Sequence, residues 1–227
     1  MLGYFERRVN PYPDTPAPAP PRGFLAFVWS CTAGLRPYIA GMTLLAAAIG
    51  AFEALLFALL GRLVDWLGEV ERARLWDEGG ATLLLLAAIL LASPIAVLLY
   101  SLLKYQTLSG NFPMLLRWNF HRRMLDQSLS FYQDEFAGRV AAKVMQTALA
   151  TRDTVLIVTD ILVFVSIYFV TMVSVVGSFD PLLLLPFFGW LLLYVGALGY
   201  FVPRLAKVAT LQADARSLMT GRITDAY

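Results

Sequence analysis

The stretch Val155–Gly177 reads VLIVTDILVFVSIYFVTMVSVVG, and Asp160 is its only ionisable residue. A helix of about 20 apolar residues is long enough to cross roughly 30 Å of hydrocarbon. Three further stretches of the chain meet the same criterion, namely Tyr38–Leu60, Ala81–Leu103 and Leu182–Val202. The sequence therefore predicts an all-α membrane protein with spans at about 38–60, 81–103, 155–177 and 182–202.

The composition of the whole chain supports this class and argues against several others. Of its 227 residues, 59% are hydrophobic and 15% are charged, against about 45–50% and about 25% in soluble domains. The net charge of +2 provides no field that would attract nucleic acid. Cys31 is the single cysteine and His121 the single histidine, so the usual spacings of a metal or redox site are absent. We expect no metal site, no catalytic residue and no nucleic-acid partner.

The basic residues predict the orientation. The connection Gly61–Gly80 holds three arginines, and the connection Ser178–Pro181 holds no basic residue. The other 15 of the 18 Lys and Arg lie before the first span, between the second and third, or after the fourth. Because basic residues favour the cytoplasmic side, we expect both ends and the middle connection in the cytoplasm.

The N-terminal region has two predicted parts. Residues 1–21 form a cytoplasmic, proline-rich tail, because proline has a fixed φ and no backbone donor. Residues 22–36, RGFLAFVWSCTAGLR, are apolar but too short to span, and arginines bound them, which is typical of an interfacial elbow helix. The alternative is an early start of the first span, against which Pro37 argues because proline marks a first helical position.

The connection Lys104–Thr154 has 51 residues, whereas helix–helix connections in bundles usually have about 2–8. Its apolar residues recur at near-helical spacing on both sides of residues 130–138. We therefore expect two membrane helices to continue into the cytoplasm and to meet at a tip, with a kink near Gly110 and Pro113. After the fourth span, the polar residues 204–217 predict a similar helical continuation.

The predicted tip is Ser130–Gly138, SFYQDEFAG. Ser130 is expected to cap a short helix and Gly138 to end it. The aromatic residues of this exposed segment indicate a partner surface, and the alternative is that they staple the two helical extensions together. Thr220 and Gly221 predict a second break in the helix that follows the fourth span.

With these features the chain resembles the transmembrane domain of an ABC exporter of the six-span, swapped-helix type. The resemblance extends from Arg22 to Tyr227 and is carried by GRLVDWL, FYQDEFAGRVAAKVMQTALATRD and SLMTGRITDAY. It implies a first coupling helix around residues 131–138 and a second around residues 219–227, each docked on a nucleotide-binding domain. The coupling residues that it implies are Phe131, Tyr132, Asp134, Glu135, Phe136, Gly138, Arg139, Thr220, Gly221 and Arg222. Many family members have Gly-Glu where this chain has Gly138-Arg139.

The resemblance implies the permease part of an ATP-driven exporter in a bacterial inner (plasma) membrane. Such a protein moves a hydrophobic or amphipathic substrate by alternating access, works as a homo- or heterodimer, and binds ATP and Mg in its nucleotide-binding domains. A phosphate loop needs a lysine directly after a glycine, and Lys104, Lys143 and Lys207, the three lysines, do not follow one. We therefore expect a truncated chain without ATPase activity of its own, with two spans and a nucleotide-binding domain following in the full-length, ATP-hydrolysing translocase.

Two other functions are compatible with four spans. A self-standing membrane binding or scaffold protein is the first, and the long structured connection argues against it. A membrane-embedded enzyme is the second, but its spans would need converging polar clusters, and the predicted spans hold only Glu53 and Asp160 as ionisable residues.

Glu53 is the candidate residue for the substrate path. It follows Tyr38 by 15 residues, which places it roughly 22 Å from the inner end of its helix. Because a charge that faces lipid is costly, we expect Glu53 to face the bundle interior or a water-filled cavity. There it either binds a cation, a cationic substrate or a proton, or is a protonated acid bonded to a backbone carbonyl.

The topology can be tested with single cysteines at Gly68 and at Asp126 on a Cys31→Ser background. An impermeant maleimide added to intact cells should label the first and spare the second, because the basic residues place these connections on opposite sides. Labelling at position 126 from outside would refute the predicted orientation.

Overall fold

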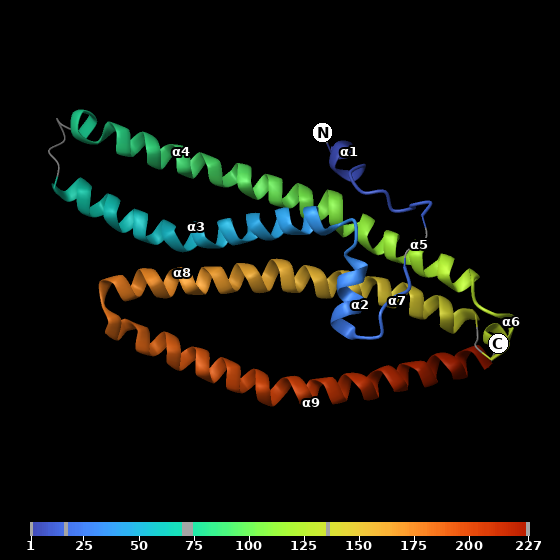
Figure 1. The fold of residues 1–227 in the computed structure, drawn as a ribbon. Coiled ribbons are helices and arrows are strands. Elements are labelled where there is room, and N and C mark those ends of the chain that lie inside the picture. The colour runs from blue at the N-terminus through green and yellow to red at the C-terminus, as the bar shows by residue number, and fades with distance from the viewer. Residues whose placement is uncertain (1, 16–17, 70–74, 135–136, 226–227) are drawn as a thin grey trace. The chain divides into compact units, whose positions relative to one another are not determined.

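The protein is almost entirely helical in the part of the chain that the computed structural model describes, residues 2–15, 18–69, 75–134 and 137–225 (Figure 1). No β-strand occurs within these ranges. The long helical run is built from α3 (Arg36–Glu69), α4 (Leu75–Ser101), the π-helix η2 (Leu102–Ser109), α5 (Asn111–Leu125), α7 (Ala137–Leu156), the π-helix η3 (Ile157–Leu162), α8 (Val163–Phe179) and α9 (Leu184–Asp225). The short elements are α1 (Leu2–Glu6), α2 (Phe24–Cys31), α6 (Leu129–Asp134) and the 3₁₀-helix η4 (Pro181–Leu183).

Within the described ranges, four of the helical stretches are long and apolar enough to cross a membrane. They are Arg36–Trp66, Leu83–Leu125, Val140–Phe179 and Pro181–Gln212, and each overlaps one of the spans predicted from the sequence. Each has at least 31 residues, more than the roughly 20 that a span requires. The predicted fold class, an all-α membrane protein, is confirmed.

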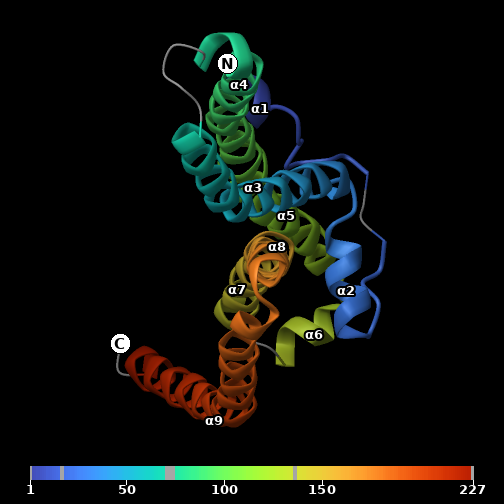
Figure 2. The same cartoon turned by 90° about the vertical axis from the view of Figure 1, so that its left-hand side faces the viewer.

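The chain divides into two compact units, Met1–Met172 and Val173–Tyr227. In the first unit α3 packs beside α4, and α5 packs beside α7 (Figure 1). The short helix α2 runs across the direction of α3, as Figure 2 shows from the end of the long helices. The second unit contains the end of α8, the turn and α9.

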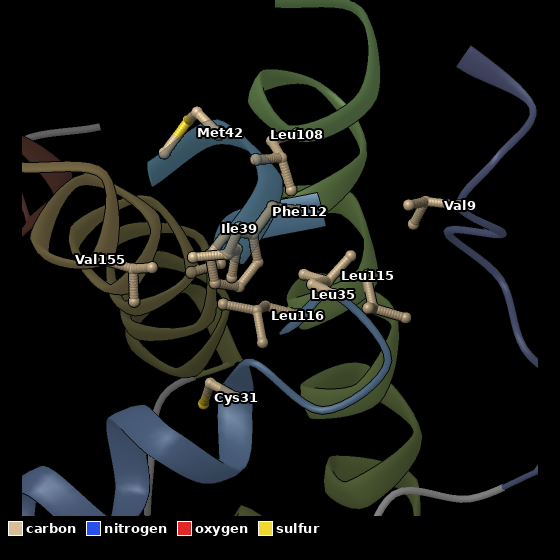
Figure 3. Packing of buried hydrophobic residues seen from close by; sticks show 11 residues of the cluster. Val9, Cys31, Leu35, Ile39, Met42, Leu108, Phe112, Leu115, Leu116 and Val155 are labelled. Atoms are coloured by element: carbon tan, nitrogen blue, oxygen red, sulfur yellow. The ribbon is translucent and has the colours of Figure 1, made fainter. Parts of the chain in front are cut away.

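The hydrophobic core of the first unit lies where the start of α3, the η2–α5 segment and the α7–η3 segment meet (Figure 3). Phe112, Leu35, Met42 and Leu108 are its largest fully buried apolar side chains. The other buried members of this cluster are Val9, Cys31, Ile39, Leu115, Leu116, Ala148 and Val155. Burial raises the pKa of the Cys31 thiol, and a hydrogen bond with Ser30 acts in the opposite direction. The core therefore joins segments that are up to about 150 positions apart in the sequence.

A tight turn joins α8 to α9 within the second unit. Asp180 caps it, since its Oδ1 accepts from the backbone N–H of Leu182 at 2.8 Å, and Pro181 occupies the first helical position. A Cβ at Gly177 would lie 3.1 Å from Cδ1 of Leu184, so glycine allows the helices to approach closely here.

The elbow helix is shorter than the predicted range 22–36, because α2 ends at Cys31. The chain then turns through Gly34, whose φ of +79° lies in the left-handed region that favours glycine. The next helix, α3, begins at Arg36. Pro37 therefore lies in its first turn, as the sequence predicted.

The middle connection is helical as predicted, and α5 and α7 meet through α6. The irregularity expected near Gly110 and Pro113 begins earlier, as the π-helix η2. Two capping predictions are wrong. Ser128, not Ser130, precedes α6 and accepts from the N–H of Phe131 at 3.4 Å, the three-residue spacing of an N-cap. Gly138 does not end a helix, because it is the second residue of α7.

The break predicted at Thr220 and Gly221 is also wrong, because α9 continues through both residues to Asp225. A glycine inside a helix costs only about 1 kcal/mol relative to alanine. The flanking residues 211–219 and 222–225 are mostly ordinary helix formers, and they outweigh this cost.

The packing of α3 against α8 can be tested at Gly50. A Cβ there would lie 3.0 Å from the backbone oxygen of Phe164, so Gly50→Ala should destabilise the fold by about 1–3 kcal/mol through overpacking. Gly61→Ala in the same helix is the matched control, since nothing lies within 4 Å of its Cβ, and it should be neutral or gain up to about 1 kcal/mol. Unfolding in mixed micelles measures both, and equal effects would contradict the close contact.

Candidate functional site

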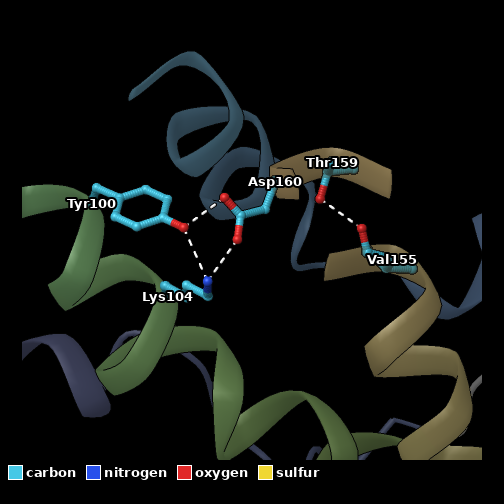
Figure 4. Close-up of polar contacts among 5 residues, drawn as sticks. All are labelled: Tyr100, Lys104, Val155, Thr159 and Asp160. Carbon is cyan, nitrogen blue, oxygen red and sulfur yellow. Dashed lines mark hydrogen bonds and ion pairs between the residues drawn. The ribbon is translucent and has the colours of Figure 1, made fainter. Parts of the chain in front are cut away.

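Three polar side chains meet between two helical segments that are about 56 residues apart in the sequence (Figure 4). Lys104 Nζ lies 2.6 Å from Oδ2 of Asp160. The hydroxyl of Tyr100 donates to Oδ1 of the same carboxylate at 2.5 Å and accepts from Lys104 Nζ at 3.0 Å. Each group of this triad, Tyr100–Lys104–Asp160, contacts both of the others.

The triad neutralises a buried acid. Asp160 is only 4% exposed, and it lies in the candidate span Val140–Phe179. A carboxylate within a membrane segment is costly unless it is paired and hydrogen-bonded. Lys104 supplies the opposite charge and Tyr100 a further donor, so both carboxylate oxygens have a partner. The Lys104 side chain is 21% exposed, so it is the more solvent-accessible partner of this ion pair.

Both charged residues lie in π-helical turns. Lys104 is part of η2 and Asp160 is part of η3. A π-helical turn includes one extra residue and so rotates the following side chains by about 100° relative to an uninterrupted α-helix. Such turns in long helices are frequent at functional sites. The two π-helices also both contact α3, and the triad therefore stands at a junction of three helices.

The triad links two helical segments. It ties the α4–η2–α5 segment to the α7–η3–α8 segment at one level, just beside the hydrophobic core. Among the described residues, no group of three or more His, Cys, Asp or Glu could hold a metal ion. What the arrangement can do is to make the two helical segments move together, or to release them when the ion pair opens.

The structure describes only some of the predicted coupling residues of the tip. Tyr132 is exposed and donates its hydroxyl to the carbonyl of Met124 at 2.5 Å, and its ring meets that of Phe131 edge to face. This bond ties α6 to the end of α5 but does not join α5 to α7, so the stapling of the two extensions stays a prediction. The positions Glu135 and Phe136, and the side chains of Asp134, Gly138 and Arg139, lie outside the described residues.

The other predicted site residues lie apart from the triad along the chain. Arg222 is exposed on α9, and the side chains at Thr220 and Gly221 lie outside the described residues. Glu53 is exposed on α3 and makes no hydrogen bond or ion pair with another described residue. Its role in a substrate path stays a prediction.

Sequence analysis missed the triad, because it assigned Lys104 to the connection and Asp160 to the edge of a span. A signal was present, since Lys104 and Asp160 both lie 28 residues from Tyr132 in the predicted tip. In two antiparallel helices that meet at a tip, residues at equal distances from it lie at the same level. Opposite charges at the same level of an apolar helix pair predict an ion pair.

One comparison with known proteins gives a relative. A Haemophilus influenzae protein described as an "uncharacterized ABC transporter ATP-binding protein" is 52% identical to this chain over all 227 residues. The chain spans 37% of the length of that relative. No protein-family model and no solved structure matches the chain. The chain is therefore related to an ABC transporter component, and the four long apolar helices in the part of it that the structure describes make it a membrane protein.

The triad predicts a marked difference between single and double substitutions. Asp160→Leu leaves the Lys104 charge unpaired, which costs about 3–5 kcal/mol in buried pairs, and the partial exposure of Lys104 puts this pair at the lower end. Adding Lys104→Met should recover most of the loss. The free energy of unfolding in mixed micelles measures both.

The ion pair Arg152–Asp153 is the matched control for the triad. Its N···O distance is 2.7 Å, but the Asp153 side chain is 53% exposed, so Asp153→Asn should cost less than about 1 kcal/mol. If Asp160→Leu cost no more than Asp153→Asn, the triad would not be a structural tie.

Proposed function

We propose that this chain is part of the permease of an ATP-driven ABC exporter and moves a hydrophobic or amphipathic substrate by alternating access. The observation that carries the proposal is the length of two of its apolar helical stretches. Leu83–Leu125 has 43 residues and Val140–Phe179 has 40, which corresponds to roughly 60–65 Å at 1.5 Å per residue. The hydrocarbon core is about 30 Å thick, so about half of each stretch extends beyond it.

These extensions are built to transmit a movement. α5 and α7 pack along each other, and the core and the triad join them to the spans. A displacement of the tip is then carried to the membrane as a movement of packed helices, since close-packed interiors deform little. This is the property that a transport domain requires if an ATP-binding domain outside the membrane drives it.

The tip and the residues directly before it, 125–129, present apolar side chains to solvent. Leu125 is 67% and Leu129 is 75% exposed, and Tyr132 is exposed beside them. Exposed apolar groups at the end of a helix pair favour a protein partner. In the proposal this partner is a nucleotide-binding domain, and the contact includes the sequence-predicted residues Phe131–Arg139, with residues 220–222 of α9 at a second contact.

The relative supports an ATP-driven system. Its description includes ATP binding, and this chain spans 37% of its length. None of the lysines of this chain follows a glycine as in a phosphate loop. In the proposal, ATP and Mg therefore bind in domains beyond this segment, the N-terminus is cytoplasmic in a bacterial inner membrane, and a second transmembrane subunit completes the substrate path.

Glu53 belongs to this proposed path. It is exposed on α3 and has no partner among the described residues, and an acid in that position is costly if it faces lipid. A second subunit or a water-filled path would supply its polar surroundings. The alternative function, a self-standing membrane scaffold, has no comparable use for a rigid helix pair twice as long as the membrane requires.

The coupling role of the tip can be tested in a full-length protein that carries this chain together with its ATP-binding domains. Leu129→Asp should uncouple ATP turnover from the ATP-dependent change in labelling of a cysteine placed at Gly68, because a charge on the apolar tip disrupts docking. Phe136→Ala should act in the same direction. Expected changes are on the order of tenfold, as for the loss of one interface anchor.

Met145→Asp is the matched control, because Met145 is also exposed, at 50%, but lies on α7 away from the tip. Membrane insertion and ATP binding should be the same in all three variants. If Leu129→Asp and Met145→Asp behaved alike, the docking surface would not be at the tip.

A further inference from the structure

Residues 3–14, which we call the N-terminal strap, lie against α3, η2 and α5. The strap consists of the greater part of α1 and the non-helical stretch that follows. Val9 is its buried anchor, 7% exposed and in contact with the hydrophobic core (Figure 3). The other side chains of the strap are exposed or half-buried, so its attachment depends on Val9 and on its backbone.

Helix side chains bind the carbonyl oxygens in the first half of the strap. Thr107 Oγ1 donates to Phe5 O at 3.1 Å, Asn111 Nδ2 to Glu6 O at 2.8 Å, and the Tyr38 hydroxyl to Arg8 O at 3.1 Å. α1 also packs against η2. The donors belong to α3, η2 and α5, so a few residues of the strap reach three helical segments.

The second half of the strap is held in the same manner. Trp118 Nε1 and Arg122 Nη1 donate to the carbonyl oxygen of Pro13 at 3.1 and 3.0 Å, and Arg122 also donates to that of Asp14 at 2.6 Å. The ring of Tyr12 meets that of Trp118 edge to face, with centroids 5.6 Å apart. Because proline has no backbone N–H and resists helix formation, these carbonyls stay available to the donors of α5.

These contacts bridge a weak point of the long helix. The donors Thr107 and Arg122 lie on either side of Gly110, where the π-helix η2 passes into α5. The π-helical turn and the glycine both make this junction easier to bend than an uninterrupted α-helix. Tyr38 ties the same strap to the first turn of α3. The strap therefore spans the η2–α5 junction and connects it to the neighbouring helix α3.

We propose that the N-terminal strap is a releasable splint, which holds the η2–α5 junction in the conformation seen here and frees it to bend when the strap detaches. Detachment exchanges the carbonyl contacts for water and exposes one apolar side chain, Val9, so it leaves the rest of the core in place. The inference that the strap affects transport rests on the proposed function. The inference that it affects the flexibility of α5 does not.

The test is hydrogen exchange of the backbone amides in α5, with trypsin cleavage after Arg8 as the measure of strap release. Val9→Asn should detach the strap, because a polar amide replaces its buried apolar anchor. Cleavage after Arg8 should then become rapid, and exchange in Asn111–Leu125 should rise on the order of tenfold. Exchange in residues 164–172 of α8 should stay unchanged. Deletion of residues 2–14 should reproduce the increase in α5 exchange.

Arg7→Gln is the matched control within the strap, because Arg7 is exposed and its side chain makes no contact that supports the attachment. It should leave cleavage after Arg8 slow and α5 exchange unchanged. If the deletion left α5 exchange unchanged, the strap would not be a splint, whether or not the chain still transported. If exchange rose equally in α5 and α8, the strap would be an integral part of the fold and not releasable. Failure of the tip variants with an intact strap response would instead refute the proposed function.

Discussion

The pairing of Asp160 with Lys104 and Tyr100 is the constraint to which the rest of the helix arrangement is fitted. A buried carboxylate in an apolar helix is tolerated only where an opposite charge and a hydrogen-bond donor reach it. Here both partners come from a helix that runs antiparallel to it, at distances of 2.5–2.6 Å from the carboxylate oxygens. A shift of one helical turn, about 5.4 Å, would break both contacts. The triad thus sets the level at which the two helical segments pair.

The π-helices, the hydrophobic core and the N-terminal strap of the first unit all lie near the triad. The π-helices η2 and η3 bring the charged residues toward each other, and both contact α3. The apolar core follows directly, since Leu108 and Phe112 lie one and two turns beyond Lys104 and are fully buried. The N-terminal strap binds to the same η2–α5 segment from a further side. One short segment of chain therefore carries an ion pair, part of the core and the strap contacts.

This concentration of contacts contrasts with α4, with α9 and with the tip. Both α4 and α9 expose many large apolar side chains, as expected for helices that face lipid or further membrane segments. The described residues of the tip make local contacts, among them the hydrogen bond from Tyr132 to Met124. A firmly joined middle with an exposed tip is what a lever between a membrane domain and an external partner requires. That physical arrangement, together with the ABC transporter relative, is why transport is the function that we propose.

The local and long-range features of this protein differ in how far they could be predicted. Apolar runs such as Val155–Gly177 predict membrane helices because a backbone in hydrocarbon must satisfy its hydrogen bonds internally, and the continuation of helices through residues 104–154 follows from their periodicity. Helix ends were less predictable. Gly138 and Gly221 lie inside helices, because a single glycine costs less than the neighbouring residues contribute.

The sequence by itself determined the class of the protein, the number of long apolar helices and the position of the tip, since each depends on composition and periodicity along one segment. Only the tertiary structure decided which polar residues are partners. The π-helical turns of η2 and η3, the meeting of Lys104 with Asp160, and the docking of the strap carbonyls on Thr107, Asn111 and Arg122 join segments 56 to 109 positions apart. No pattern within one segment encodes such contacts, and the equal spacing of Lys104 and Asp160 from Tyr132 is informative only once their two helices are known to pair.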